Sequence, residues 1–123
     1  MRKRDLESFK KSLFRLKEIV HEKKTIVNRD ATLKQFEFTV ELAWKTIKRF
    51  LREKGIDCRS PRDCLEEGFK YGLVEDNEKW MDMIKDRNII VHLYSETVAN
   101  IIYKRIKSYA KMLDSLKDKL EKV

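Results

Sequence analysis

The sequence predicts an all-α protein, an up-and-down bundle of four or five helices. Its apolar residues recur every three or four positions over long stretches, which is the period of one face of an α-helix. Only three glycines and one proline interrupt 123 residues, and no run shows the alternation of a half-buried strand. A chain of this length buries enough surface for one core, so we expect a single helical-bundle domain over residues 1–123.

The first two predicted helices differ in the width of their apolar faces. The first carries one continuous stripe, formed by Leu6, Phe9, Leu13, Leu16 and Val20. The second, over residues 28–54, has a wider face and should be a central helix that contacts neighbours on two sides. That face consists of Leu33, Phe36, Phe38, Val40, Leu42, Ala43, Trp44, Ile47 and Phe50. Gly55 then provides a C-terminal stop.

Capping residues divide the rest of the chain into a short helix over 61–71 and two longer ones. A serine or aspartate oxygen can accept an unpaired backbone N–H at a helix start, and proline has no such N–H to leave unpaired. The residues of this kind are Ser60 with Pro61, Asp76 or Asn77, and Ser95, while Gly72 ends the short helix. The last helix has an apolar stripe formed by Val98, Ile102, Ile106, Tyr109, Leu113, Leu116 and Leu120.

The charge of the chain favours an anionic partner. It has 29 lysines and arginines against 21 acidic residues, a net charge of +8. The excess is concentrated in residues 1–24, with nine basic and four acidic side chains, whereas residues 55–76 have three and six. A basic surface attracts nucleic acid through counterion release. The alternative is a charge-rich solvated surface of the kind found in heat-tolerant proteins.

The composition also bears on the compartment of the protein and on whether it binds a metal ion or a cofactor. No segment is apolar enough to cross a membrane and the N-terminal residues lack the apolar core of a secretory signal, so we expect a cytoplasmic protein. Cys58 and Cys64 are spaced C-x5-C with no histidine nearby, which is a poor metal site. We interpret them as structural or incidental thiols of a reducing compartment rather than a disulfide scaffold. We expect neither a metal nor a cofactor.

An arginine interrupts the apolar face of the fourth predicted helix. On a helical wheel Arg87 lies in the middle of the face formed by Trp80, Ile84 and Val91, while Asp86 points away from it. A guanidinium remains charged, so burying it without a partner is costly. Three interpretations follow: a structural salt bridge with Glu37 or Glu41 of the central helix, an oligomer interface, or a cleft in which Arg87 binds a phosphate.

His92 favours the last interpretation and suggests a chemistry. Histidine can take a proton from a ribose 2′-OH or give one to a leaving 5′-oxygen, and arginine can stabilise the phosphate, which suits RNA cleavage without a metal. Asn88 lies one turn before His92 and could orient either His92 or the substrate. Arg87 and His92 are about 140° apart on the wheel, so a two-fold dimer would be needed to bring pairs from both chains into one groove. The alternative for His92 is a structural histidine, and we interpret the other one, His21, as a surface residue.

The stretch RNIIVHLY, residues 87–94, resembles the R-x4-H-x-Y motif of HEPN-domain proteins. Three further blocks resemble, in order, those of one HEPN subfamily, the nucleotidyltransferase substrate-binding proteins: FEFTVELAWKTIKRFL, SPRDCLEEGFKYGLV and KWMDMIKDRN. Together they cover roughly residues 5–115. The resemblance implies a four- or five-helix bundle, a homodimer, and a minimal nucleotidyltransferase (MNT) as partner, often as the antitoxin of a toxin–antitoxin pair.

The same resemblance implies roles for the motif residues. Arg87 and His92 would be the catalytic residues of a metal-independent endoribonuclease at the dimer groove, supported by Asn88. Tyr94 would accept AMP from the MNT antitoxin, and the added anion would block an RNA phosphate. The subfamily name implies another role, in which the chain presents a substrate to the nucleotidyltransferase. In a third interpretation the chain is a helical dimerisation module and Arg87 is only an ion pair.

Glu41 and Asp86 belong to the matching blocks as supporting residues. For each we weigh a structural role against an orienting role at the site. A structural Glu41 could pair with Lys45 one turn on, or reach Arg87. Trp44 and Trp80 fall on apolar stripes, so we interpret them as core residues rather than platforms for stacked bases.

Overall fold

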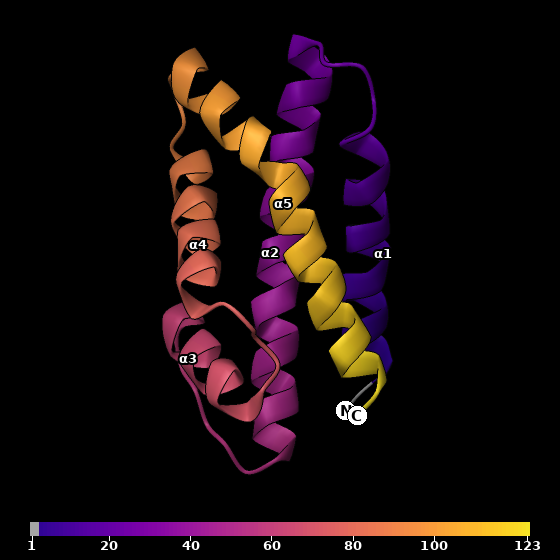
Figure 1. Ribbon diagram of the computed structural model, residues 1–123, viewed down its shortest axis with the longest axis vertical. Coiled ribbons are helices and arrows are strands. Elements are labelled where there is room, and N and C mark those ends of the chain that lie inside the picture. The colour runs from indigo at the N-terminus through magenta and orange to yellow at the C-terminus, as the bar shows by residue number, and fades with distance from the viewer. Residues whose placement is uncertain (1–2) are drawn as a thin grey trace.

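The computed structural model describes residues 3–123, and this range contains five α-helices in up-and-down order and no strand (Figure 1). The helices are α1 (Lys3–Ile19), α2 (Ile26–Glu53), α3 (Pro61–Tyr71), α4 (Asn77–Val91) and α5 (Glu96–Glu121). The predicted all-α bundle, with four longer helices and one short one, is confirmed. None of these helices is both long and apolar enough to cross a membrane.

The longest helix, α2, is the centre of the bundle. It contacts each of the other four helices, as its wide apolar face predicts. Figure 1 shows α1 on one side of α2, and α3 and α4 on the other side. α5 crosses obliquely in front of α2, from the end of α4 toward the start of α1. The start of α1 and the end of α5 lie close together, and α4 and α5 meet at the opposite end of the molecule.

The ends of the helices follow the predicted capping residues. The side chains of Ser60, Asp76 and Ser95 each accept a hydrogen bond from a backbone N–H in the first turn of the helix that follows. Thr25 caps α2 in the same way, so this helix starts two residues before the predicted position. Gly72 ends α3 with φ at 94°, a left-handed conformation that glycine adopts without steric cost. These boundaries are local in origin, which explains why the sequence predicts them.

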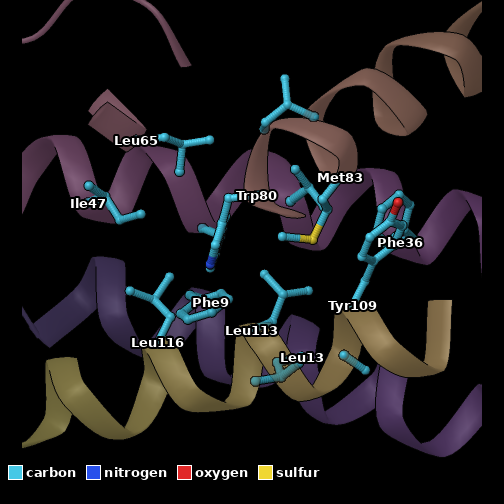
Figure 2. Close-up of a cluster of buried hydrophobic side chains, with 14 of the residues drawn as sticks. Phe9, Leu13, Phe36, Ile47, Leu65, Trp80, Met83, Tyr109, Leu113 and Leu116 are labelled. Atoms are coloured by element: carbon cyan, nitrogen blue, oxygen red, sulfur yellow. The ribbon is translucent and has the colours of Figure 1, made fainter. Parts of the chain in front are cut away.

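All five helices contribute to one core (Figure 2). The side chains labelled in Figure 2 are Phe9 and Leu13 of α1, Phe36 and Ile47 of α2, Leu65 of α3, Trp80 and Met83 of α4, and Tyr109, Leu113 and Leu116 of α5. The ring of Phe36 stacks on that of Tyr109 with centroids 5.5 Å apart, which joins α2 to α5. Each fully buried side chain of this size contributes about 1.5–3 kcal/mol. Trp80 is a core residue, as predicted, and Trp44 packs against the core from its edge.

Two residues predicted to lie on apolar faces are exposed. Phe38 is 52% exposed, on the outer side of α2, where the ammonium of Lys34 lies 5.1 Å from its ring centroid. Val91 is 46% exposed at the last residue of α4. The buried face of α4 is instead centred on Trp80 and Met83. The helical wheel therefore gave the wrong direction for the centre of the buried face of α4.

The interpretation of the two cysteines as free thiols was wrong. Cys58 and Cys64 form a disulfide, and both are almost fully buried. The loop after α2 turns back over the first turn of α3, which brings the two Cα atoms to 5.1 Å, within the range that a disulfide bridges. The bond therefore fixes this loop to α3.

Candidate functional site

The motif residues lie where α4 ends. Arg87 and Asn88 are still helical, whereas His92 is the C-terminal cap, with φ −121° and ψ 34°. The backbone N–H of His92 bonds to the carbonyl of Ile89 at 3.1 Å, which closes the last turn. The chain then turns through Tyr94 before α5 begins. The end of a helix thus places a cation, an amide, an imidazole and a phenol within eight residues.

Arg87 forms an ion pair with the central helix. Its Nη2 donates to Glu41 Oε2 at 2.7 Å, and its Nη1 donates to Asn88 Oδ1 at 3.0 Å. The predicted pair within the chain is therefore present, with Glu41 rather than Glu37, which pairs with Lys34. The side chain of Arg87 is still 25% exposed, although its Nε is buried and has no hydrogen-bond partner among the described residues.

Glu41 is shared by three donors. Besides Arg87, it accepts a hydrogen bond from the Trp44 indole Nε1 at 3.1 Å and pairs with the Lys45 ammonium at 3.2 Å. Burial alone would raise the pKa of Glu41, but these bonds and the charge of Arg87 lower it below its ordinary value. Both structural contacts predicted for Glu41, with Lys45 and with Arg87, are present together.

Asp86 does not point away from the bundle, and that prediction was wrong. It is only 3% exposed and accepts hydrogen bonds from Arg105 Nη1 at 3.0 Å and from the Tyr109 hydroxyl at 2.5 Å, both on α5. Burial and the bond to Asp86 raise the pKa of Tyr109, and the bond to Asp86 raises that of Arg105. Asp86 thus attaches α4 to α5 one residue before Arg87. The contacts of Asp86 with Arg105 and Tyr109 were not predicted, because both partners lie on another helix.

His92 and Tyr94 face solvent. Tyr94 is 97% exposed, and His92 is also exposed. Neither side chain forms a hydrogen bond or ion pair within residues 3–123. The structure therefore brings Arg87, Asn88 and Glu41 into contact and leaves the imidazole and the phenol free for another molecule.

A hollow of about 420 Å³ lies beside Tyr94, between the start of α2 and the junction of α4 with α5. One of its walls is Arg29, whose side chain is only 4% exposed and which the sequence analysis missed. The guanidinium binds Glu96 at 2.5 Å and Asp30 at 2.8 Å, and these bonds raise the pKa of Arg29. A signal was available, because Arg29 lies one turn before Leu33 on the apolar face of α2.

This set of side chains suits an anion and a proton transfer. Arginine and asparagine can hold a phosphate, and a histidine side chain can accept or donate a proton. Within residues 3–123 no three His, Cys, Asp or Glu side chains come together in a way that could hold a metal ion.

An antiparallel bundle with the R-x4-H-x-Y residues at the end of its fourth helix defines a HEPN-type protein. The chain belongs to the family described as nucleotidyltransferase substrate binding protein like, which matches residues 4–122. The resemblance inferred from the sequence blocks is thereby confirmed.

Three solved structures share the fold. One, from Thermus thermophilus, is 33% identical with a TM-score of 0.86, and the match covers 91% of this chain and 98% of that one. Another, from Haemophilus influenzae and named for the fold of a substrate binding domain of a nucleotidyltransferase, is 24% identical with a TM-score of 0.83, over 94% and 98% of the chains. The third is a tri-AMPylated Shewanella oneidensis HEPN toxin in complex with MNT antitoxin, 16% identical with a TM-score of 0.81 over both full chains.

One curated relative is named Probable ribonuclease HepT, from Haemophilus influenzae. It is 32% identical over 82 residues, which are 63% of this chain and 56% of the relative. The match thus spans little more than half the length of that relative.

Proposed function

We propose that this protein is the HEPN toxin of a HEPN/MNT toxin–antitoxin pair, and that it cuts RNA without a metal ion. The observation that carries the proposal is the end of α4. There Glu41 and Asn88 hold the Arg87 guanidinium, the Arg87 side chain as a whole is 25% exposed, and His92 faces solvent. The relative named as a ribonuclease and the AMPylated toxin with the same fold support this proposal.

The reaction assigns a proton transfer to His92 and charge stabilisation to Arg87. A histidine base removes the proton of a ribose 2′-OH, and the oxygen attacks the adjacent phosphorus. The bond from phosphorus to the 5′-oxygen breaks, and the same histidine, now protonated, gives its proton to that oxygen. The products are a 2′,3′-cyclic phosphate and a 5′-hydroxyl end. Arg87 would stabilise the negative charge that develops on the phosphate oxygens. Asn88, which accepts a hydrogen bond from Arg87, would orient the guanidinium.

A second copy of the chain completes the site in this proposal. Within one chain His92 has no bond to Arg87, and the helix ends between the two side chains. A two-fold axis beside the end of α4 would face each Arg87 with the His92 of the other chain. The whole chain, residues 1–123, would act as one domain of such a homodimer in the cytoplasm.

Tyr94 is proposed as the point of control. It is 97% exposed, so the active site of an MNT partner could reach its hydroxyl. The hydroxyl would attack the α-phosphorus of ATP and release pyrophosphate. The AMP left on Tyr94 would then exclude an RNA phosphate from the groove by its size and its charge.

A second function is favoured by the Arg87–Glu41 pair. Because the guanidinium is already neutralised, the chain could be a non-catalytic subunit that presents a substrate to the nucleotidyltransferase. The family name and the Haemophilus influenzae structure named as a substrate binding domain support this alternative.

Cleavage of RNA in the presence of EDTA separates the two functions. We expect the parent protein to cut single-stranded RNA with EDTA present, and Arg87→Ala and His92→Ala each to lose at least roughly 100-fold in rate. His21→Ala is the matched control, because it removes the other histidine of the chain. A parent protein that leaves RNA intact, but on which the transferase activity of its partner depends, would establish the alternative.

The control by AMP has its own test. The protein is incubated with its MNT partner and ATP and then examined by mass spectrometry. We expect the adduct on Tyr94 and its loss in Tyr94→Phe. Tyr71→Phe is the control, because Tyr71 is also exposed, at 44%.

A further inference from the structure

A basic groove lies between the first turns of α1 and the C-terminal half of α2. Its volume is about 370 Å³, and it is separate from the hollow beside Tyr94. The charged side chains that line it are Arg4 and Asp5 of α1 and Lys45, Lys48, Arg49 and Arg52 of α2. Five cations and one carboxylate therefore face the same space.

Three of these cations are not neutralised. Arg49 has an ion pair with Asp5 at 3.5 Å, and Lys45 has one with Glu41. By contrast, Arg4, Lys48 and Arg52 have no carboxylate within ion-pairing distance among the described residues. Concentrated positive charge in a concave surface favours a polyanion over a single small anion.

The groove also has an aromatic wall. Trp44 is half-buried and packs one side against the core, while it lines the groove with the other. The ammonium of Lys48 lies 6.0 Å from the centroid of its ring. A cationic groove with an aromatic side chain is the combination that single-stranded nucleic acid binds, through its phosphates and one stacked base.

A stripe of side chains on α2 leads from the groove to Arg87. Glu41, Lys45, Lys48 and Arg52 are spaced by 4, 3 and 4 residues, so they form one stripe along α2. Arg87 pairs with Glu41 at the first end of this stripe, and the Trp44 indole binds the same carboxylate oxygen. Eleven residues of helix span about 16 Å, which is long enough for more than one phosphate of an extended single strand.

We infer that this groove binds the backbone of the RNA strand whose phosphate is held at Arg87. The inference rests on the proposed function and names its substrate class: a single strand that runs along α2 from Arg87 toward Arg52. Lys48, Arg52 and Arg4 contact phosphates, and Trp44 supports one base. The groove thereby determines how the strand enters the site, not the chemistry of the cut.

Binding to a labelled single-stranded RNA oligonucleotide tests the groove separately from cleavage. The measurements use the His92→Ala protein, so that the RNA stays intact. Lys48→Gln with Arg52→Gln should reduce the slope of log K against log salt by about 1.4 and weaken binding about 25-fold at about 0.1 M salt. Arg4→Gln, on the opposite wall, should reduce the slope by about 0.7 more. Lys107→Gln with Lys111→Gln, both exposed on α5, is the matched control and should bind like the parent.

Each result bears on the groove or on the proposed function in a distinguishable way. Groove variants that fold normally by circular dichroism and bind RNA like the α5 control overturn the inference, even if the parent cuts RNA. If the groove variants weaken RNA binding but the parent protein does not cut RNA, the inference about the groove is supported and the proposed nuclease function is wrong. Unchanged RNA affinity with weakened binding of the MNT partner would assign the groove to that protein and overturn the inference.

Discussion

Glu41 controls how Arg87 is held. Its side chain is 30% exposed, and its carboxylate accepts from an indole, an ammonium and a guanidinium at once. A carboxylate with three donors of this kind binds its proton weakly, which is why its pKa is lowered. The pair keeps Arg87 in one direction while part of its side chain stays exposed, which suits a phosphate ligand.

Glu41→Gln should make stability less sensitive to acid. The folded-state pKa of Glu41 lies below the unfolded value of about 4.5, so its charge stabilises the fold above that pH, and this contribution disappears as the pH falls through the lower folded value. We expect the variant to lose about 1 kcal/mol at pH 7 and to match the parent in strong acid. Urea unfolding at both pH values measures this. Glu37→Gln is the control, since Glu37 pairs with Lys34 and not with Arg87. An equal loss at both pH values would show that the charge of Glu41 is not the cause.

Tyr109→Phe tests the attachment of α4 to α5. The hydroxyl donates to Asp86, which is 3% exposed, so its removal leaves a buried carboxylate with one donor fewer. We expect the free energy of unfolding to fall by about 1–3 kcal/mol, measured with urea at pH 7. Tyr103→Phe removes the hydroxyl of a half-buried tyrosine on the same helix and should cost less than about 0.5 kcal/mol, the size of a surface change. Equal losses in the two variants would contradict a special role for Asp86.

The site residues differ in how far the sequence could predict them. The Glu41–Arg87 pair was one of three stated interpretations, because both residues fall on helix faces that a bundle brings together. The partners of Asp86 could not be predicted, since Arg105 and Tyr109 lie about twenty residues away on another helix. Periodicity shows which face of a helix is apolar, but it does not show which charged residue finds a partner across the bundle.

At the level of the helices, strong stripes and caps were predicted well and a weak stripe was not. α1 and α5 have long regular stripes, and every predicted stripe residue is buried except the first of each, Leu6 and Val98, which are partly buried. In α4 apolar residues lie on several sides, including the exposed Ile89 and Val91, so the wheel gave the wrong centre for its buried face. The direction in which α4 packs is determined by α2, α3 and α5 together.

The disulfide fixes the loop between α2 and α3, and its removal should destabilise the bundle. Cys58 and Cys64 close a short loop, so the chain-entropy model gives a loss of about 2 kcal/mol for Cys58→Ser with Cys64→Ser. Thermal unfolding with and without dithiothreitol measures it. Reductant should lower the midpoint of the parent and leave that of the double variant unchanged. A parent whose midpoint does not respond to reductant would contradict this expectation.

At the level of the whole molecule, the arginine and the histidine of the proposed reaction do not bond to each other within one chain. Arg87 is directed toward α2, whereas His92 lies past the end of α4 and faces solvent. The apolar side chains exposed on these two helices, Phe38 and Val91, suit a surface that another chain covers. A second copy of the chain would cover them and would face the free imidazole with an arginine.

Mixing two inactive variants tests this arrangement. Arg87→Ala keeps its histidine and His92→Ala keeps its arginine, so a mixed dimer retains one complete pair that spans the two chains. Random mixing makes half of the dimers mixed, and each mixed dimer has one complete arginine–histidine pair where the parent dimer has two. We therefore expect RNA cleavage to return to about a quarter of the parent rate. The mixture is unfolded and refolded together to exchange chains, and cleavage is measured with EDTA present. A mixture as inactive as its components, although chain exchange is shown by mass spectrometry, would mean that the arginine and histidine of one chain act together. In that case the end of α4 would have to change shape when RNA binds, because its present geometry leaves the two side chains without contact.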